Sequence, residues 1–352
     1  MRRRHPDTPL DDDGGEGSGP ADVQEPQDVR QISLRLRGEP TIRRVDNFLS
    51  QRYGPHSRAY YQKLIKAGKV SVNGHSINAS YRLHDGDLVE FELPVQAPRI
   101  IPARPMDLAI LHEDADVLVI NKPPGIICHP GKKLTDDTLA SGIIHHLHGD
   151  REGVHNPGIV HRLDYDTSGV MVLAKHPAAH VDLSRQFESR SVRKEYLALV
   201  RGRVRRRFGQ IAMPIGYNPA RYGLMSTAEN AVKPKPALSA YEVRERFGNH
   251  TLVSVVPKTG RTHQIRVHFE SIGHPLVGER YYRGGLSPEP AEERMPRLAL
   301  HAWKLALTHP GSGKPVEFTA ELPADFAAIL GHLRREEPEE VVPPAASAPQ
   351  DA

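Results

Sequence analysis

One stretch, His161 to Lys175 (HRLDYDTSGVMVLAK), constrains the fold of this chain more than any other. Its first half is polar and places one carboxylate, Asp164, between Arg162 and a run of small residues that begins at Thr167. Its second half is apolar from residue 170 to residue 174. Small polar residues favour a turn, and a short unbroken apolar run after a turn favours a buried strand. The stretch therefore predicts a loop that presents Asp164 in front of a buried strand.

The spacing within this stretch is more specific than a turn requires. An Asp in a loop commonly does no more than bond its own backbone. The pattern HRLDxxTSGxxxxAK, however, resembles the signature of the RluA/RluD-type pseudouridine synthases and matches it at all nine fixed positions. The resemblance implies that Asp164 is the catalytic carboxylate of an isomerase that converts uridine in RNA to pseudouridine.

Two further motifs extend the resemblance. KEYLALV at 194–200 implies a catalytic tyrosine, Tyr196, whose ring stacks on uracil or whose hydroxyl takes part in proton transfer, with a core tyrosine as the alternative. GRTHQIR at 260–266 implies that Arg261 lies beside Asp164. An arginine there would brace the carboxylate through two parallel bonds and keep it ionised in a partly dry pocket.

The same resemblance suggests which residues contact the substrate. We expect Arg162 to fill the gap left when a uridine is extracted from its helix, because enzymes that act on a base must take it out of the stack. Thr167 and Lys194 are expected to position the substrate, with simple exposure as the alternative for Lys194. Ile265 and Leu300 are expected to line the pocket or the core, and the sequence does not separate these two roles.

A second pattern occupies residues 41–93. Two short helical faces, with Ser57 as the predicted N-cap of the second, are followed by an Asn73-Gly74 turn and an alternating strand. The order SRAYYQKLIKAGKVSVNG and then LHDGDLVEF resembles the small RNA-binding domain named after ribosomal protein S-four. The resemblance implies that cations of this segment contact RNA phosphates, with an ordinary solvated face as the alternative. The main candidates are Arg58, Lys63 and Lys66, and Arg43, Arg44 and Lys69 add to them.

The patterns divide the chain into five segments. We expect disordered tails at 1–29 and 334–352, the S-four-like domain at 30–93, a proline-rich linker at 94–105 and the catalytic domain at 106–333. Strand patterns predominate in the catalytic domain, and no regular βαβ repeat occurs. The predicted fold class is therefore α+β, with a mixed, largely antiparallel sheet and flanking helices. The arginine-rich stretch 201–209 and the segment 214–236 are least like the family and would adjust RNA contact or be tolerated surface loops.

Composition limits the partners. The formal net charge of +4 and pI of about 9.1 permit nucleic-acid binding, and both tails are acidic, so the middle of the chain is more basic than the whole. We expect ribosomal RNA of the large subunit as substrate, with transfer RNA second. The single cysteine, Cys128, excludes an internal disulfide, fits a reducing cytoplasm and is expected in the core.

Several features are expected to be absent. No run of eighteen apolar residues occurs, so no membrane span is expected. His145, His146 and His148 lack nearby Cys or carboxylate residues at ligand spacing, so no metal site is expected. The isomerisation has no redox step, so no cofactor is expected. The chain is expected to be monomeric.

Two other functions compete with the isomerase. A catalytically inactive RNA-binding or ribosome-assembly factor could keep the fold, although the intact motifs argue against it. A glycoside hydrolase could use Asp164, but the motif offers no second carboxylate of the kind such enzymes pair. An assay of purified protein on unmodified RNA separates these hypotheses.

Overall fold

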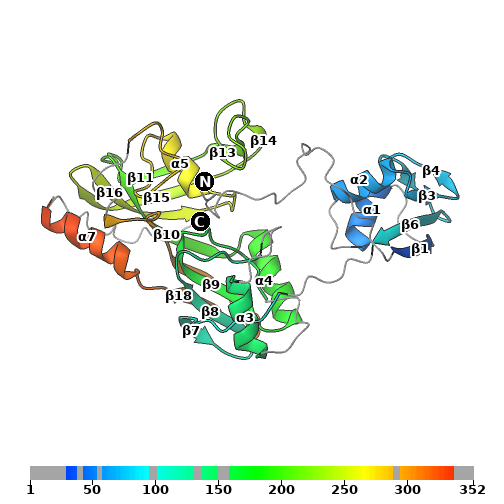
Figure 1. Ribbon diagram of the computed structural model, residues 1–352, viewed down its shortest axis with the longest axis horizontal. Coiled ribbons are helices and arrows are strands. Elements are labelled where there is room, and N and C mark those ends of the chain that lie inside the picture. The colour runs from blue at the N-terminus through cyan, green and yellow to red at the C-terminus, as the bar shows by residue number, and fades with distance from the viewer. Residues whose placement is uncertain are drawn as a thin grey trace. The chain divides into compact units, whose positions relative to one another are not determined.

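The computed structural model describes residues 29–37, 43–53, 58–94, 101–130, 137–149, 158–287 and 294–336. The chain divides into two compact units (Figure 1), one within Asp11–Arg99 and one that includes Ile100–Ala352. Most of the predicted tails, the linker residues 95–100 and the predicted N-cap Ser57 lie outside the described residues. No helix in the described part of the chain is long and apolar enough to cross a membrane.

The smaller unit packs two helices on a four-stranded sheet. Val45, Phe48 and Tyr61 contribute helical side chains to its core, as the apolar spacing predicts. Asn73 and Gly74 both have positive φ, 51° and 77°, which confirms the predicted tight turn between β3 and β4. The elements are α1 (Val45–Arg52), α2 (Arg58–Lys66) and the sheet β1 (Val29–Arg35), β6 (Leu88–Pro94), β3 (Val70–Val72) and β4 (His75–Ser76), with a separate pair β2 (Arg43–Arg44) and β5 (Arg82–Leu83).

A nine-stranded sheet forms the centre of the larger unit. Neighbouring strands are antiparallel except for β9 and β17, which run parallel. In spatial order the sheet contains β11 (Phe208–Ile211), β15 (Ser239–Phe247), β16 (His250–Pro257), β10 (Arg193–Arg201), β17 (Leu300–Thr308), β9 (Ser168–Ala174), β8 (Val117–Lys122) and β7 (Ile110–Glu113), with β18 (Pro315–Thr319) on β17. This arrangement confirms the predicted mixed, largely antiparallel α+β fold.

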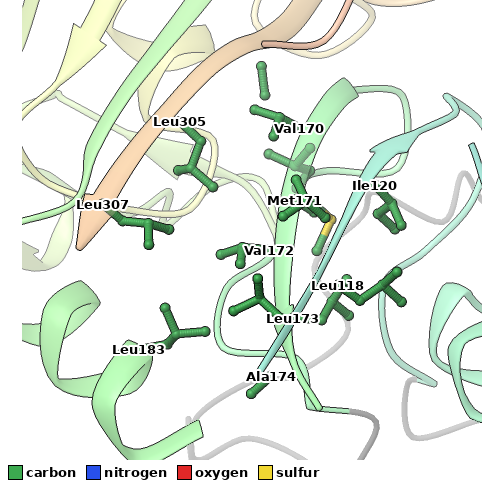
Figure 2. Packing of buried hydrophobic residues seen from close by; sticks show 14 of the residues in the cluster. Leu118, Ile120, Val170, Met171, Val172, Leu173, Ala174, Leu183, Leu305 and Leu307 are labelled. Carbon is green, nitrogen blue, oxygen red and sulfur yellow. The ribbon is translucent and has the colours of Figure 1, made fainter. Parts of the chain in front are cut away.

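The apolar run 170–174 is the buried strand that the sequence predicts. All seven residues of β9 are buried, and its side chains meet those of β8 and β17 (Figure 2). Two helices, α3 (Leu139–His148) and α4 (Pro177–Ser189), add Leu139, Ile143 and Leu183 to the same cluster. Pro177 is the first residue of α4, and His176 caps the helix by accepting from the Ala179 N–H. Cys128 is buried in this core, as predicted.

The other half of the sheet is covered on both faces. On β10, Ala198 and Val200 face a cluster that includes α5 (Gln264–Ser271), whereas Leu197 and Leu199 face a cluster that includes α7 (Ala324–Glu336). This alternation follows from the two-residue period of a strand. Helix α7 was not predicted from the sequence. It ends at Glu336, three residues beyond the predicted boundary of the catalytic domain.

The segment 214–236, one of the two stretches least like the family, contains a small sheet of its own. Strand β12 (Ile215–Tyr217) lies between β13 (Met225–Ser226) and β14 (Val232–Lys235). The backbone N–H of Met225 donates to the hydroxyl of Tyr282 at 2.9 Å, which attaches this small sheet to the segment that follows α5.

Candidate active site

The loop that carries Asp164 is held in place by buried cations. The fully buried Lys122 ammonium donates to the carbonyl oxygens of Tyr165 at 3.2 Å and Thr167 at 2.9 Å, as well as to that of Pro123. The Arg297 guanidinium donates to the carbonyl oxygen between them, that of Asp166, at 3.0 Å. Three successive carbonyl groups therefore have charged donors, which hold the backbone of the loop in place.

The remaining motif residues fasten the same loop to the sheet. The His161 Nε2 accepts from the Val172 N–H at 3.1 Å while its ring stacks on Phe187. Burial, with a smaller contribution from the Lys194 charge, lowers the pKa of His161 to about 3, so the ring is neutral. Gly169 has φ 121°, and a side chain there would overlap the carbonyl oxygen of Ala302 on β17. His161 and Gly169 are thus structural residues of the motif.

Asp164 lies beside an arginine, but not the predicted one. The Asp164 Oδ2 is 3.5 Å from the Nη1 of Arg266, whose side chain is 3% exposed, and the Asp164 side chain is 22% exposed. The Arg261 Nε instead donates to the carbonyl oxygen of Pro236 at 3.2 Å. The prediction that Arg261 braces Asp164 is therefore wrong. The motif GRTHQIR contains two arginines, and α5 begins at Gln264, so the second arginine projects from the first helical turn while the first remains in the preceding loop.

A buried glutamate orients Arg266. The Glu279 carboxylate accepts from Nε at 2.8 Å and from Nη2 at 2.9 Å, which leaves Nη1 directed at Asp164. Glu279 also accepts from the backbone N–H groups of Arg280 and Tyr281, each at 2.9 Å. Burial would raise the pKa of Glu279, but the charge and hydrogen bonds of Arg266 lower it to about 2. The bidentate pair is thus ionised, and it fixes the plane of the guanidinium.

A tyrosine and a histidine complete this side of the site. Tyr282 Oη and His263 Nδ1 lie 2.7 Å apart, and the Arg266 guanidinium lies over the Tyr282 ring at 5.1 Å. Because Oη already accepts from the Met225 N–H, its own proton is best used on Nδ1, which places the imidazole proton on Nε2. Burial lowers the pKa of His263 to about 4, against the opposing charge of Asp164.

These neighbours determine the charge of Asp164. Burial would raise its pKa, but the positive charges of His263, Arg266 and Arg162 outweigh burial, so the pKa lies below its usual value. Since His263 is itself neutral at pH 7, the permanent cations are Arg266 and Arg162. Asp164 is therefore ionised at neutral pH although it is only partly exposed.

Tyr196 lies at a bulge of β10, where the register with β17 shifts between Glu195 and Tyr196. Its ring is half-buried and packs against both the β8–β9 cluster and the α5 cluster. Burial and the charge of Asp164 raise its pKa, so the phenol keeps its proton. Within the described residues its hydroxyl makes no hydrogen bond. The geometry is compatible with both predicted roles, stacking on a base and proton transfer.

The other predicted contact residues differ in exposure. Arg162 is exposed next to Asp164. Lys194 is half-buried, with its ammonium 5.9 Å from the Phe187 ring, and burial lowers its pKa. Thr167 is buried, and its N–H donates to the Asp164 carbonyl at 3.1 Å, so in this structure it shapes the loop and is not open to a substrate. Ile265 and Leu300 are both buried in the α5 cluster.

A separate group of cations lies on the smaller unit. The Asp46 carboxylate has no exposed surface and accepts two hydrogen bonds from Arg44 at 3.1 and 3.0 Å and one from Arg58 at 3.0 Å. Gln62 donates to it at 2.7 Å. Burial would raise the pKa of Asp46, but these hydrogen bonds lower it to about 2. Arg44 and Arg58 are almost half exposed, and the other predicted cations Lys63, Lys66 and Lys69 are exposed.

One group of side chains has the composition of a metal site. Ligand atoms of Asp114, Asp116 and His309 lie within 4.8 Å of one another. The His309 Nδ1, however, accepts from the N–H groups of Gly311 and Ser312 at 3.2 and 3.1 Å, so a neutral ring carries its proton on Nε2 and donates it to Asp114. A metal-bound histidine normally donates from its second nitrogen. The hydrogen bonds of these residues therefore fit a structural network and do not fit a metal centre.

Sequence reasoning missed four residues of the site: Arg266, Glu279, Tyr282 and His263. Two of them stand inside the motif GRTHQIR, which was assigned to its first arginine alone. Glu279 and Tyr282 come from HPLVGERYY at 274–282, where an isolated Glu gives no sign that it is buried. The signal that was available was the i, i+3 spacing of His263 and Arg266, which places both on one face at the start of a helix.

Comparison with known proteins identifies the family of this chain. The model of a family described as RNA pseudouridylate synthase matches residues 116–271, and the S4 domain model matches residues 43–89. The uncharacterized RNA pseudouridine synthase YlyB of Bacillus subtilis is 39% identical over 310 residues, which cover 87% of this chain and 99% of that protein. A solved human structure, RNA pseudouridylate synthase domain containing 4, superposes with a TM-score of 0.52 and 28% identity over 64% of this chain and 93% of its own.

The chain therefore belongs to the RNA pseudouridylate synthase family, with an S4 domain near its N-terminus. It is an isomerase that converts uridine in RNA to pseudouridine. Among its relatives is the ribosomal large subunit pseudouridine synthase D of Nitrosomonas europaea, which is 39% identical over 296 residues, 83% of this chain and 84% of that protein.

Proposed function

We propose that this enzyme isomerises specific uridines of large-subunit ribosomal RNA and that Asp164 is its catalytic carboxylate. The observation that carries the proposal is the ion pair of Asp164 with Arg266, itself clamped by the buried Glu279. A partly buried carboxylate is ordinarily neutralised by a raised pKa, and this one is kept ionised by fixed cations. The choice of RNA is supported by the relatives named for the ribosomal large subunit.

The reaction breaks the bond between the ribose and N1 of uracil, turns the base and joins the same ribose carbon to C5. Asp164 acts on the sugar, either by attack on the anomeric carbon or by taking a proton from the adjacent carbon. Tyr196 contacts the base, with its phenol protonated because burial raises its pKa. In the last step C5 loses its proton and N1, which has lost its bond to the ribose, gains one, so the uracil regains its conjugation and the isomerisation balances.

The remaining residues have supporting roles in this proposal. Arg162, which is exposed beside Asp164, enters the RNA helix in place of the extracted uridine. The S4 domain, with Arg58, Lys63 and Lys66 exposed on α2, holds the RNA backbone and supplies affinity without sequence selection. The enzyme acts as a monomer in the cytoplasm, where ribosomal RNA is made accessible during assembly.

The test combines cells and purified protein. Ribosomal RNA from a strain that lacks the gene is expected to lose pseudouridine at the target positions, and the purified enzyme is expected to restore it on unmodified transcript. Asp164→Asn, which keeps size and polarity, should bind the transcript and leave it unmodified. If wild type and Asp164→Asn both bind but neither modifies RNA, the protein is an assembly factor. If only transfer RNA is modified, the proposed substrate is wrong while the role of Asp164 stands.

A further inference from the structure

Five arginines lie within seven residues, 201–207, where the chain passes from β10 to β11. Arg203, Arg205 and Arg206 are exposed, and the intervening Val204 is buried. The family match leaves this stretch without a role, and an ordinary surface loop would need neither the buried valine nor so many like charges.

The backbone of this arginine loop (residues 201–207) is held by hydrogen bonds from buried side chains of the sheet. The Val204 N–H donates to the Thr251 hydroxyl at 3.0 Å, and that hydroxyl donates to the Gly202 carbonyl at 2.8 Å. Arg246, only 8% exposed, donates to the carbonyl oxygens of Val204 at 3.0 Å and Arg205 at 3.1 Å. A loop with these partners has little freedom to lose when a ligand binds, so its exposed guanidinium groups are presented in a preorganised array.

The charges of the loop are only partly compensated. Arg207 pairs with Glu242 at 3.7 Å and lies over the exposed Phe208 ring at 5.1 Å. Arg205 and Arg206 make no ion pair or side-chain hydrogen bond with any residue that the structure describes. The buried guanidinium of Arg246 adds a further positive charge beneath them. Like charges gathered on a rigid support repel one another, and an anionic ligand would relieve that repulsion.

The loop is anchored on the face of the sheet that carries the active site. Val204 belongs to the same cluster as Ile265 of α5, the helix from which Arg266 reaches Asp164. Tyr196 also packs on this cluster, whereas α7 covers the opposite face. Tyr196 and Arg201 are five positions apart along β10, a distance of about 17 Å. An RNA strand that enters the active site spans such a distance with a few nucleotides.

We propose that Arg203, Arg205 and Arg206 form a phosphate-binding site for the RNA backbone that flanks the target uridine. The proposal deepens the proposed function and rests on it. The site contributes to affinity and to the placing of the RNA across the catalytic sheet, and it takes no part in the chemical step. Its ligand class is the phosphodiester backbone, which guanidinium groups recognise through paired hydrogen bonds.

The test uses the full chain and an unmodified transcript of large-subunit ribosomal RNA. Arg205→Gln/Arg206→Gln is compared with Arg185→Gln/Lys314→Gln, a control that removes two exposed cations from α4 and from the hairpin between β17 and β18. We expect the first double variant to raise the KM for RNA by about tenfold, to reduce the slope of log affinity against log salt by about 1 to 2, and to leave kcat unchanged. The control should change each quantity much less.

The lysine pair Arg205→Lys/Arg206→Lys keeps the charge and is expected to recover most of the affinity. Equal affinity and salt slope in the glutamine variant and the control would overturn the proposal. The exposed arginines would then be assigned to binding an acidic protein partner. A fall of kcat with unchanged KM would also overturn it. Affinity is measured separately from modification. A wild type that binds RNA but does not modify it would refute the proposed function, and the affinities of the glutamine variant and the control would still test the phosphate-binding site.

Discussion

In each of the two units a buried carboxylate holds arginine side chains in place, but the arginines act on different partners. In the S4 domain the buried carboxylate of Asp46 holds Arg44 and Arg58, whose side chains are almost half exposed. In the catalytic domain the buried carboxylate of Glu279 holds Arg266, whose Nη1 is paired with Asp164. The first arrangement presents positive charge to a ligand in water, and the second applies it to a single carboxylate that is only partly exposed.

The difference follows from the local dielectric. Two unit charges about 4 Å apart interact by about 1 kcal/mol in water and several times more strongly where water is excluded. An exposed arginine therefore gives long-range attraction that salt screens, whereas a buried arginine can set the pKa of one neighbour. Removing an exposed arginine should therefore change KM and the salt dependence of binding. Removing a buried arginine should change kcat and its pH dependence.

The largest effect is expected for Arg266→Met. Loss of the cation beside Asp164 should lower kcat by about 10²-fold or more and raise the pKa of Asp164. Because the role proposed for Asp164 requires its ionised form, the acid limb of the pH–rate profile should move to higher pH. Single-turnover rates between pH 4 and 8 measure this shift. Arg261→Met serves as the matched control and should leave the acid limb where it is, since Arg261 bonds to the Pro236 carbonyl.

Glu279→Gln tests the clamp behind that arginine. Breaking a buried ion pair from one side typically costs about 3 to 5 kcal/mol of unfolding free energy, so Tm should fall. We expect kcat at a temperature well below the new Tm to fall by about 10-fold, because Arg266 remains but is less well oriented. Glu279→Asp keeps the charge at a shorter reach and should recover part of both quantities. An unchanged kcat in Glu279→Gln would show that the orientation of Arg266 does not limit the reaction.

Asp46→Asn is the corresponding change in the S4 domain, and here kcat should not move. Removing the carboxylate frees Arg44 and Arg58 from their fixed positions, and we expect the affinity for RNA to fall by a few-fold up to about tenfold. The pKa of Asp46 is about 2 in the fold against 3.8 when unperturbed, so its stabilisation is fully present above about pH 4 and is lost as the pH falls toward 2. Acid unfolding of this unit, followed by hydrogen exchange in the full chain, should lose that pH dependence in Asp46→Asn.

The two ion pairs that attach helix α7 to the catalytic domain give a third comparison, in which we expect a smaller effect. Helix α7 is attached by Asp325 to Arg297, which also holds the Asp166 carbonyl, and by Arg334 to Glu245 on β15. Asp325→Asn should lower kcat by about three- to fivefold, because it loosens the loop behind Asp164. Glu245→Gln breaks the exposed tether of the same helix, which is worth under about 1 kcal/mol, and should leave kcat unchanged. Equal kcat in both variants would remove Arg297 from the support of the loop.

The sequence reached the fold class because its strongest patterns were local. The run 170–174 and the turn at Asn73-Gly74 are each determined within a few residues, and both were confirmed. Helix α7 was missed because its apolar residues lie next to a Glu- and Pro-rich segment that was read as a tail.

The choice between Arg261 and Arg266 could not be made in the same way. Both arginines belong to one motif, and their roles separate only when the start of α5 is known to the residue. The burial of Glu279 could not be predicted for a different reason. It depends on contacts with Arg266 and with backbone groups of a turn that has no periodic sequence pattern. Sequence periodicity reports which side chains face a core, and it does not report where a charged group meets its partner.

Strand β17 lies in the middle of the catalytic sheet, between β10 and β9, although it is formed by residues near the end of the described chain. A hydrogen bond between its His301 and Ser168, the first residue of β9, joins residues that are 133 positions apart. The sheet of the S4 domain, by contrast, is complete once β6 ends at Pro94. A ribosome that adds about 5 to 20 residues per second reaches β17 roughly 10 to 40 s later. During its own synthesis this chain can therefore fold an RNA-binding unit before the catalytic sheet has its central strand, and RNA can be bound by a nascent enzyme that is not yet able to modify it.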